Sequence, residues 1–184
     1  MRIGVFICKC GTNIAATVDT EAVARKALEY PDVVYATDYM YTCSEPGQQE
    51  IQQAIEEYDL QGVVVAACSP RMHEVTFRRA VEKAGLNRYM FEQANIREHC
   101  SWISKDTEAN TRKAIDLVRM SVEKLRFNEP LFSSQVPINK RVLVIGGGIS
   151  GIQAALDCAE GGLDVVMVER ESTIGGKMAK LDKT

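Results

Sequence analysis

The chain has 184 residues, of which 46% are hydrophobic and 26% are charged, and its formal net charge is -3 at pH 7. This composition is typical of a globular protein with enough length for one compact domain and part of another. The slightly acidic balance argues against a nucleic-acid partner, and no apolar run reaches the roughly 20 residues of a membrane span. The N-terminus lacks the pattern of a secretion signal, so we expect a cytoplasmic protein.

Short apolar runs alternate with amphipathic stretches over residues 1–128, which predicts an α/β domain. The predicted strands cover residues 2–8, 33–41, 62–67 and 89–96, and the predicted helices cover residues 21–30, 45–58, 72–84 and 108–126. Strands that alternate with helices form a parallel sheet with right-handed crossover connections. We therefore expect the carboxyl ends of the strands to lie along one edge of the sheet, where open α/β sheets bind ligands.

Cysteines follow the predicted strands of this domain. Six cysteines occur in the chain, and five of them come before residue 101, at or after the carboxyl end of a strand: Cys8, Cys10, Cys43, Cys68 and Cys100. Without a secretion signal, metal binding, redox chemistry or simple burial are better explanations than a disulfide framework. Burial alone would explain any one of them. Their shared position predicts that the thiols converge in space.

A linker and a second pattern follow this domain. Residues 129–139 carry two prolines and two serines and show no helical periodicity, which indicates an interdomain linker. From residue 140, an apolar strand leads into the GxGxxG spacing of Gly146, Gly148 and Gly151. A helix and a second strand come next, and the second strand ends in Glu169. In this order, the elements predict a dinucleotide pocket.

Each residue of this pattern has a distinct predicted task. Gly146 permits a tight turn after the strand, Gly148 lets the backbone approach a pyrophosphate, and Gly151 lets the helix lie close to the strand. Glu169 is the expected ribose-binding acid. Residues 140–184 contain only the first βαβ unit, whereas a mononucleotide-binding half is βαβαβ. We therefore expect the rest of this domain to lie beyond residue 184.

The spacing of the cysteines leaves the identity of a metal open. Four thiolates suffice for zinc or for an iron-sulfur cluster, and the spacing matches neither zinc-ribbon CxxC pairs nor the bacterial ferredoxin run. The neighbouring dinucleotide pocket favours a cluster, because zinc is redox-inert whereas a cluster exchanges electrons with a flavin. Two alternatives remain: a zinc-stabilised docking domain without redox work, and thiol-disulfide chemistry between Cys8 and Cys10. We expect His73 and His99 to be surface or supporting residues.

Five segments together resemble the heterodisulfide reductase A-subunit family of iron-sulfur flavoproteins. They are CKCGTNIA at Cys8–Ala15, YTCSEPGQ at Tyr41–Gln48, ACSPRMHE at Ala67–Glu74, NIREHCSW at Asn95–Trp102 and VLVIGGGISGIQAALD at Val142–Asp157. The resemblance covers the chain as an N-terminal fragment of that family. It implies a Rossmann-like parallel-sheet domain carrying a 4Fe-4S cluster, followed by the first βαβ unit of a thioredoxin-reductase-like FAD domain.

The resemblance also assigns residues to the two cofactors. The glycines of the motif would hold the FAD pyrophosphate, the acid after the second strand would bind the adenosine ribose, and a later glycine pair matches one found in related flavoproteins. These FAD residues are Gly146, Gly148, Gly151, Glu169, Gly175 and Gly176. The cluster would take four of the five candidates Cys8, Cys10, Cys43, Cys68 and Cys100, and Cys8 is the weakest because it still lies within its strand.

The function that the resemblance implies is electron transfer. Members of the family are parts of oxidoreductases that act on disulfides, including the CoB-CoM heterodisulfide of methanogenesis, and they pass electrons between a 4Fe-4S cluster and FAD by flavin-based electron bifurcation. The implied partners are the other components of heterodisulfide reductase and a hydrogenase or formate dehydrogenase, and a homodimer is left open. We expect no complete activity from the FAD-domain fragment in this chain.

Overall fold

The computed structural model describes residues 1–182, and the chain divides into two compact units, Met1–Phe132 and Ser133–Thr184. The strands of the first unit are β1 (Ile3–Cys8), β2 (Val33–Tyr39), β3 (Gly62–Ala67) and β4 (Phe91–Asn95). Its α-helices are α1 (Thr20–Ala27), α2 (Glu45–Glu57), α3 (Pro70–Lys83) and α4 (Thr107–Leu125). Two short helical turns are η1 (Gly11–Asn13) and η2 (Arg97–Ser101). The alternation of strands and helices confirms the predicted α/β class.

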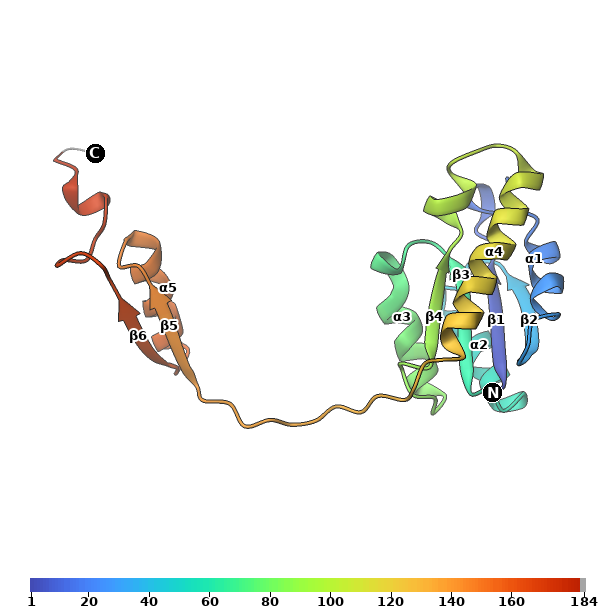
Figure 1. Cartoon of the computed structure of the whole chain (residues 1–184), viewed down its shortest axis with the longest axis horizontal. Helices are drawn as coiled ribbons and strands as arrows, with labels where there is room; N and C mark the ends of the chain where they lie inside the picture. The colour runs from blue at the N-terminus through green and yellow to red at the C-terminus, as the bar shows by residue number, and fades with distance from the viewer. Residues whose placement is uncertain (183–184) are drawn as a thin grey trace. The chain divides into compact units, whose positions relative to one another are not determined.

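The strands of the first unit form one parallel sheet in the order β2-β1-β3-β4. Helices α1 and α4 contact each other, as do α2 and α3, and Figure 1 shows α4 crossing one face of the sheet. Every residue of β1 and β3 is buried, so the core lies around these two central strands. The order reverses between them, because β2 lies on one side of β1 and β3 on the other. Ligands of open α/β sheets bind at such a switch point, beyond the carboxyl ends of the strands.

Side chains at the helix starts explain where α1 and α4 begin. The carboxylate of Asp19 accepts a hydrogen bond from the backbone N–H of Ala22 at 2.9 Å, and Asp106 caps α4 in the same way. Helix α1 ends at Ala27, before the predicted end at residue 30. Strand β2 ends at Tyr39, and the turn that follows places Tyr41 at φ +56°. A left-handed residue cannot continue a strand, so this strand is shorter than its composition predicts.

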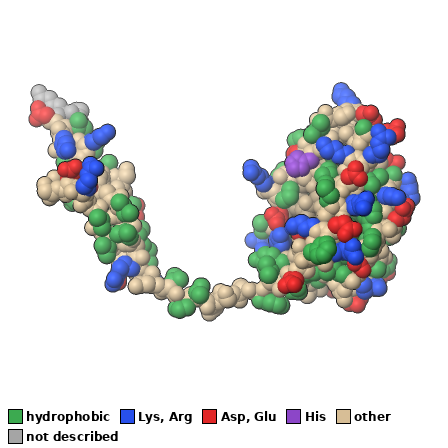
Figure 2. All heavy atoms as spheres, in the orientation of Figure 1, with side chains coloured by type: hydrophobic (Ala, Val, Ile, Leu, Met, Phe, Trp, Pro, Cys, Tyr) green, Lys and Arg blue, Asp and Glu red, His purple; other side chains and the backbone are tan. Residues whose placement is uncertain are grey.

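The second unit contains β5 (Arg141–Ile145), α5 (Ile149–Glu160), β6 (Asp164–Val168) and the short turn η3 (Met178–Lys180). Strands β5 and β6 pair in parallel, which confirms the predicted βαβ unit. One face of β5 is exposed, with Leu143 at 60% and Ile145 at 81% exposure. Figure 2 shows hydrophobic side chains at the surface of this unit. Parallel sheets normally bury both faces. The apolar side chains on this exposed face are those expected of a buried one.

Residues 128–140 have no regular secondary structure. No helix within residues 1–182 combines the length and the apolar character that crossing a bilayer requires.

Candidate functional site

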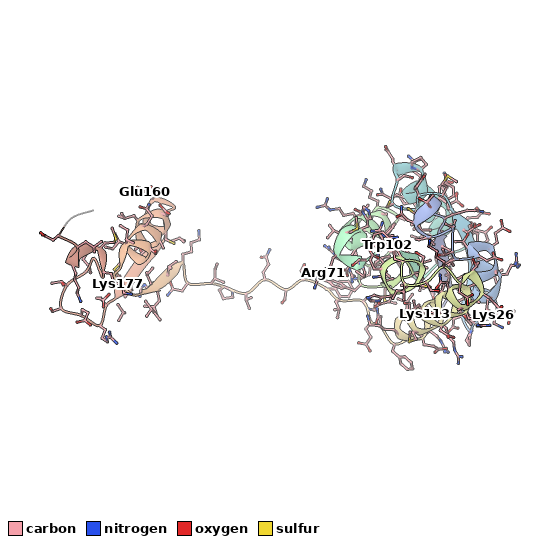
Figure 3. The ribbon with its side chains drawn as sticks, turned by 90° about the horizontal axis from the view of Figure 1, so that it is seen from above. Lys26, Arg71, Trp102, Lys113, Glu160 and Lys177 are labelled. Carbon is pink, nitrogen blue, oxygen red and sulfur yellow. The ribbon has the colours of Figure 1, made fainter. Side chains whose placement is uncertain are left out.

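The first candidate site is a cluster of thiols beyond the carboxyl ends of β1, β2 and β3. Cys8 is the last residue of β1, Cys43 lies between β2 and α2, and Cys68 directly follows β3. Together with Cys10, these residues line one small cavity of about 30 Å³. The other lining residues are Ile14, Ala67, His73 and Arg97. Figure 3 shows the side chains of this unit as sticks, with Arg71 at the start of α3 and Trp102 directly after η2 among the labelled residues.

The structure does not bring Cys100 to this cavity. Its side chain is fully buried, and its thiol donates a hydrogen bond to the backbone carbonyl of Asn110 in α4, with the sulfur 3.0 Å from the oxygen. The chain after β4 coils into η2, and this turn directs Cys100 beneath α4. Four of the five expected thiols therefore converge, and the fifth packs in the core.

Burial disfavours free thiolates in the cavity. It raises the pKa of Cys8 and Cys43, and it raises the pKa of Cys68 to about 11. Repulsion between neighbouring thiolates acts in the same direction, whereas the positive charge of Arg97 lowers the pKa of Cys43 and Cys68. Thiolates are the form that binds metals. A bound cation would supply the positive charge that these buried sulfurs lack.

Thr42 adds a polar group to the same site. Its side chain is fully buried, and its hydroxyl has no well-formed hydrogen bond within residues 1–182. The hydroxyl and the backbone of Thr42 lie against the Cys8 thiol, where they lower its pKa against the larger effect of burial. A thiolate sulfur bound to a metal would be a charged acceptor for this hydroxyl.

The donor set of four thiols is that of an iron-sulfur cluster, and the thiols would have to move to bind one. Within residues 1–182, no three Cys, His, Asp or Glu side chains lie close enough together to hold one ion. Zinc would need its sulfurs within about 2.3 Å of one point, whereas the thiolates around a cluster each bind a separate iron. The cavity of about 30 Å³ has room for roughly one or two water molecules. A cluster would therefore require the partly exposed Cys10 and Cys43 to move outward.

The second candidate site is the glycine loop between β5 and α5. Gly146 has φ +103°, which permits the tight turn that its position predicts. A Cβ at Gly151 would lie 1.9 Å from the carbonyl oxygen of Gly146, so only glycine allows α5 to approach the loop this closely. Gly148 is the N-cap of α5 and offers no side-chain cap, which leaves the first amides of the helix free for an anion.

The acid after β6 and the later glycine pair contact this loop. One carboxylate oxygen of Glu169 accepts a hydrogen bond from the N–H of Gly147 at 2.6 Å, and the other accepts one from the N–H of Glu171 at 2.9 Å. These bonds lower the pKa of Glu169. Gly175 donates its N–H to the carbonyl of Gly147 at 2.6 Å, and a Cβ at Gly176 would lie 3.1 Å from the Cα of Gly148. The middle glycine of the GGG run, which the GxGxxG spacing leaves unspecified, thus anchors both segments.

Comparisons with known proteins match both units. The sequence model of the family "FAD dependent oxidoreductase" matches residues 141–181. The whole chain is 61% identical to an iron-sulfur A subunit of the CoB-CoM heterodisulfide reductase of Methanopyrus kandleri, of which it covers 28%. It is 57% identical to the A subunit of the H2:CoB-CoM heterodisulfide, ferredoxin reductase of Methanothermobacter marburgensis, of which it also covers 28%.

A further relative carries a different electron donor in its name. The whole chain is 52% identical to the A subunit of the ferredoxin/F420H2-dependent CoB-CoM heterodisulfide reductase of Methanosarcina acetivorans, and it covers 23% of that protein. The chain thus spans about a quarter of the length of these relatives. The match runs through both the cysteine-rich unit and the glycine loop, so over its whole length the chain is similar to A subunits of heterodisulfide reductases.

Proposed function

We propose that this chain is an electron-transfer part of a heterodisulfide reductase-type flavoprotein, with a 4Fe-4S cluster in its first unit and FAD at its second. The observation that carries the proposal is the meeting of four thiols at one cavity at the switch point of the sheet. The proposed cluster ligands are Cys8, Cys10, Cys43 and Cys68. The word "iron-sulfur" in the name of one relative and the FAD-dependent family match support the two cofactors.

The residues around the cavity prepare it for sulfur-bound iron. The strand ends hold the thiols in place, and the apolar side chains of Ile14 and Ala67 limit access of water. The hydroxyl of Thr42 is available to a negatively charged sulfur. A bound 4Fe-4S cluster would supply a carrier of single electrons at this edge. At the second unit, the first amides of α5 would bind the pyrophosphate of FAD, and the glycines Gly146, Gly148 and Gly151 give it room.

The proposal extends to the longer protein that the relatives represent. We propose an oxidoreductase that acts on disulfides by flavin-based electron bifurcation, in the cytoplasm. The names of two relatives include H2, ferredoxin and F420H2, which supports an electron-input partner. The proposed partners are the other components of heterodisulfide reductase and a hydrogenase or formate dehydrogenase module.

Metal analysis of the anaerobically purified chain tests the cluster. We expect about four irons and four acid-labile sulfides per chain, and an EPR signal after reduction with dithionite. Serine in place of any one of Cys8, Cys10, Cys43 or Cys68 should lower the iron content or change the signal. The control variants Cys100→Ser and Cys158→Ser should retain both, because neither residue lines the cavity. One zinc per chain without iron would instead support a zinc-stabilised docking domain, and metal-free, freely alkylated thiols would contradict both.

A further inference from the structure

Arg97 is held at the wall of the cysteine cavity by a rigid turn. The π-helical turn η2 starts at Arg97, and the N–H of Trp102 donates to the carbonyl of Arg97 at 3.0 Å. The buried thiol of Cys100 fixes the turn to α4, and the hydroxyl of Ser101 donates to the carbonyl of Asn13. Single turns of this kind are frequent at functional sites. Cys100 therefore supports the turn that presents the cation.

The guanidinium of Arg97 is also fixed in orientation. It donates to one carboxylate oxygen of Glu98 at 2.8 Å and approaches the sulfur of Met72 at the same distance. Its central carbon lies 4.7 Å from the centroid of the Trp102 ring, and the side chain is only 13% exposed. Three different partners thus hold one charge next to the thiols. The Glu98 carboxylate has a second oxygen that is buried and has no partner within residues 1–182.

The two charges act on the cavity in opposite directions. Arg97 lines the cavity together with the four thiols, and Glu98 pairs with its guanidinium at 2.8 Å, so a positive and a negative charge both lie beside the proposed ligands. Charge interactions are strong at such a site because little water screens them. When a thiolate-bound cluster accepts one electron, the site gains one negative charge and no bond is made or broken. A fixed cation favours the reduced form, and a fixed anion favours the oxidised form.

We propose that Arg97 and Glu98 set the reduction potential of the cluster, with Arg97 raising it and Glu98 limiting the rise. This inference rests on the proposed function, because it requires a cluster in the cavity. Arg97 acts as a positioning and electrostatic residue and does not replace a ligand. The thiols bind the iron, and the adjacent Arg-Glu pair determines how readily the site takes an electron.

An EPR-monitored redox titration of the anaerobically purified chain tests this pair, with dithionite as the reductant. In Arg97→Gln, we expect the equilibrium constant for reduction to fall about tenfold, which is about 59 mV for one electron. Glu98→Gln should shift the potential upward, and Arg97→Lys should restore most of the wild-type value because it keeps the charge. Arg112→Gln is the matched control, since its exposed side chain pairs with Glu108 on α4, and its potential should not change.

The outcomes separate this inference from the proposed function. Equal iron content and equal potentials in the wild type and Arg97→Gln would overturn the inference and leave the cluster in place. A downward shift in Glu98→Gln would also overturn it, because a structural role predicts no opposite signs. If Arg97→Gln fails to fold, an upward shift in Glu98→Gln together with a near-wild-type potential in Arg97→Lys supports the inference. The absence of either result overturns it. A wild-type chain without iron would refute the inference together with the proposed function.

Discussion

Helix α2 lies so close to the loop that carries Cys43 that we predict Gly47→Ala to destabilise the chain. A Cβ at Gly47 would lie 2.6 Å from both the Cα and the carbonyl oxygen of Thr42, and these are backbone atoms that cannot rotate away. Overpacking of this kind costs about 1–3 kcal/mol. Alanine is favoured over glycine within a helix by up to about 1 kcal/mol, which offsets part of the cost. We therefore expect a net loss of up to about 2 kcal/mol in the free energy of unfolding.

Urea unfolding followed by circular dichroism measures this change, and iron content measures its effect on the site. The added Cβ would displace the backbone of Thr42, which directly precedes Cys43. We therefore expect Gly47→Ala to retain less iron than the wild type. Gln53→Ala is the matched control, because Gln53 is an exposed residue of the same helix and its substitution should stay within about 0.5 kcal/mol. A Gly47→Ala chain that is more stable than the wild type would refute the reasoning, since helix propensity alone would then govern the site.

Three further predictions concern Thr42, Cys100 and Tyr35. Thr42→Val should weaken iron retention, measured by metal analysis, because it removes a hydroxyl that lies against the Cys8 thiol. An iron content equal to that of the wild type would contradict this. Cys100→Ala should lower the free energy of unfolding by about 1–2 kcal/mol in urea unfolding and leave the iron content unchanged. The reason is that the Cys100 thiol donates its hydrogen bond to α4 and does not line the cavity. Loss of iron without loss of stability would contradict this. Burial and the bond to Glu50 raise the pKa of Tyr35 from 10.0 to about 12. The folded state thus retains this proton, so the contribution of Tyr35 to stability is complete below pH 10 and is lost as the pH rises through about 12. In urea unfolding between pH 9 and 12, Tyr35→Phe should lose less stability than the wild type, and parallel losses would contradict the assignment.

The sequence alone predicted the order of the strands and helices and the edge of the sheet at which the thiols meet. Strand β3 has the predicted bounds, Gly62–Ala67, because a continuous run of valine and alanine is bounded by Gly62 and by the Ser69-Pro70 helix start. The convergence of Cys8, Cys43 and Cys68 followed from one rule, that parallel strands share a carboxyl edge. That rule needs only the type and order of the elements, which periodicity supplies.

Tertiary contacts account for what the sequence could not predict. Cys100 follows β4 as the other thiols follow their strands, but a π-helical turn and a hydrogen bond to α4 place it in the core. No local signal distinguishes it, because its partner carbonyl lies on another element. The position of Arg97 was equally hidden, since its orientation depends on Met72 from α3 and on Trp102 from the turn. The role of Gly147 depends on Glu169, which lies directly after β6 and contacts the loop after β5 because the two strands pair.

The most direct test of the central claim is diffraction from anaerobically grown crystals, recorded on both sides of the iron absorption edge. We predict one compact anomalous iron peak among the sulfur atoms of Cys8, Cys10, Cys43 and Cys68, with Cys100 apart from it and bonded to α4. Iron at any other place in the first unit, or a single zinc ion among these sulfurs, would contradict it.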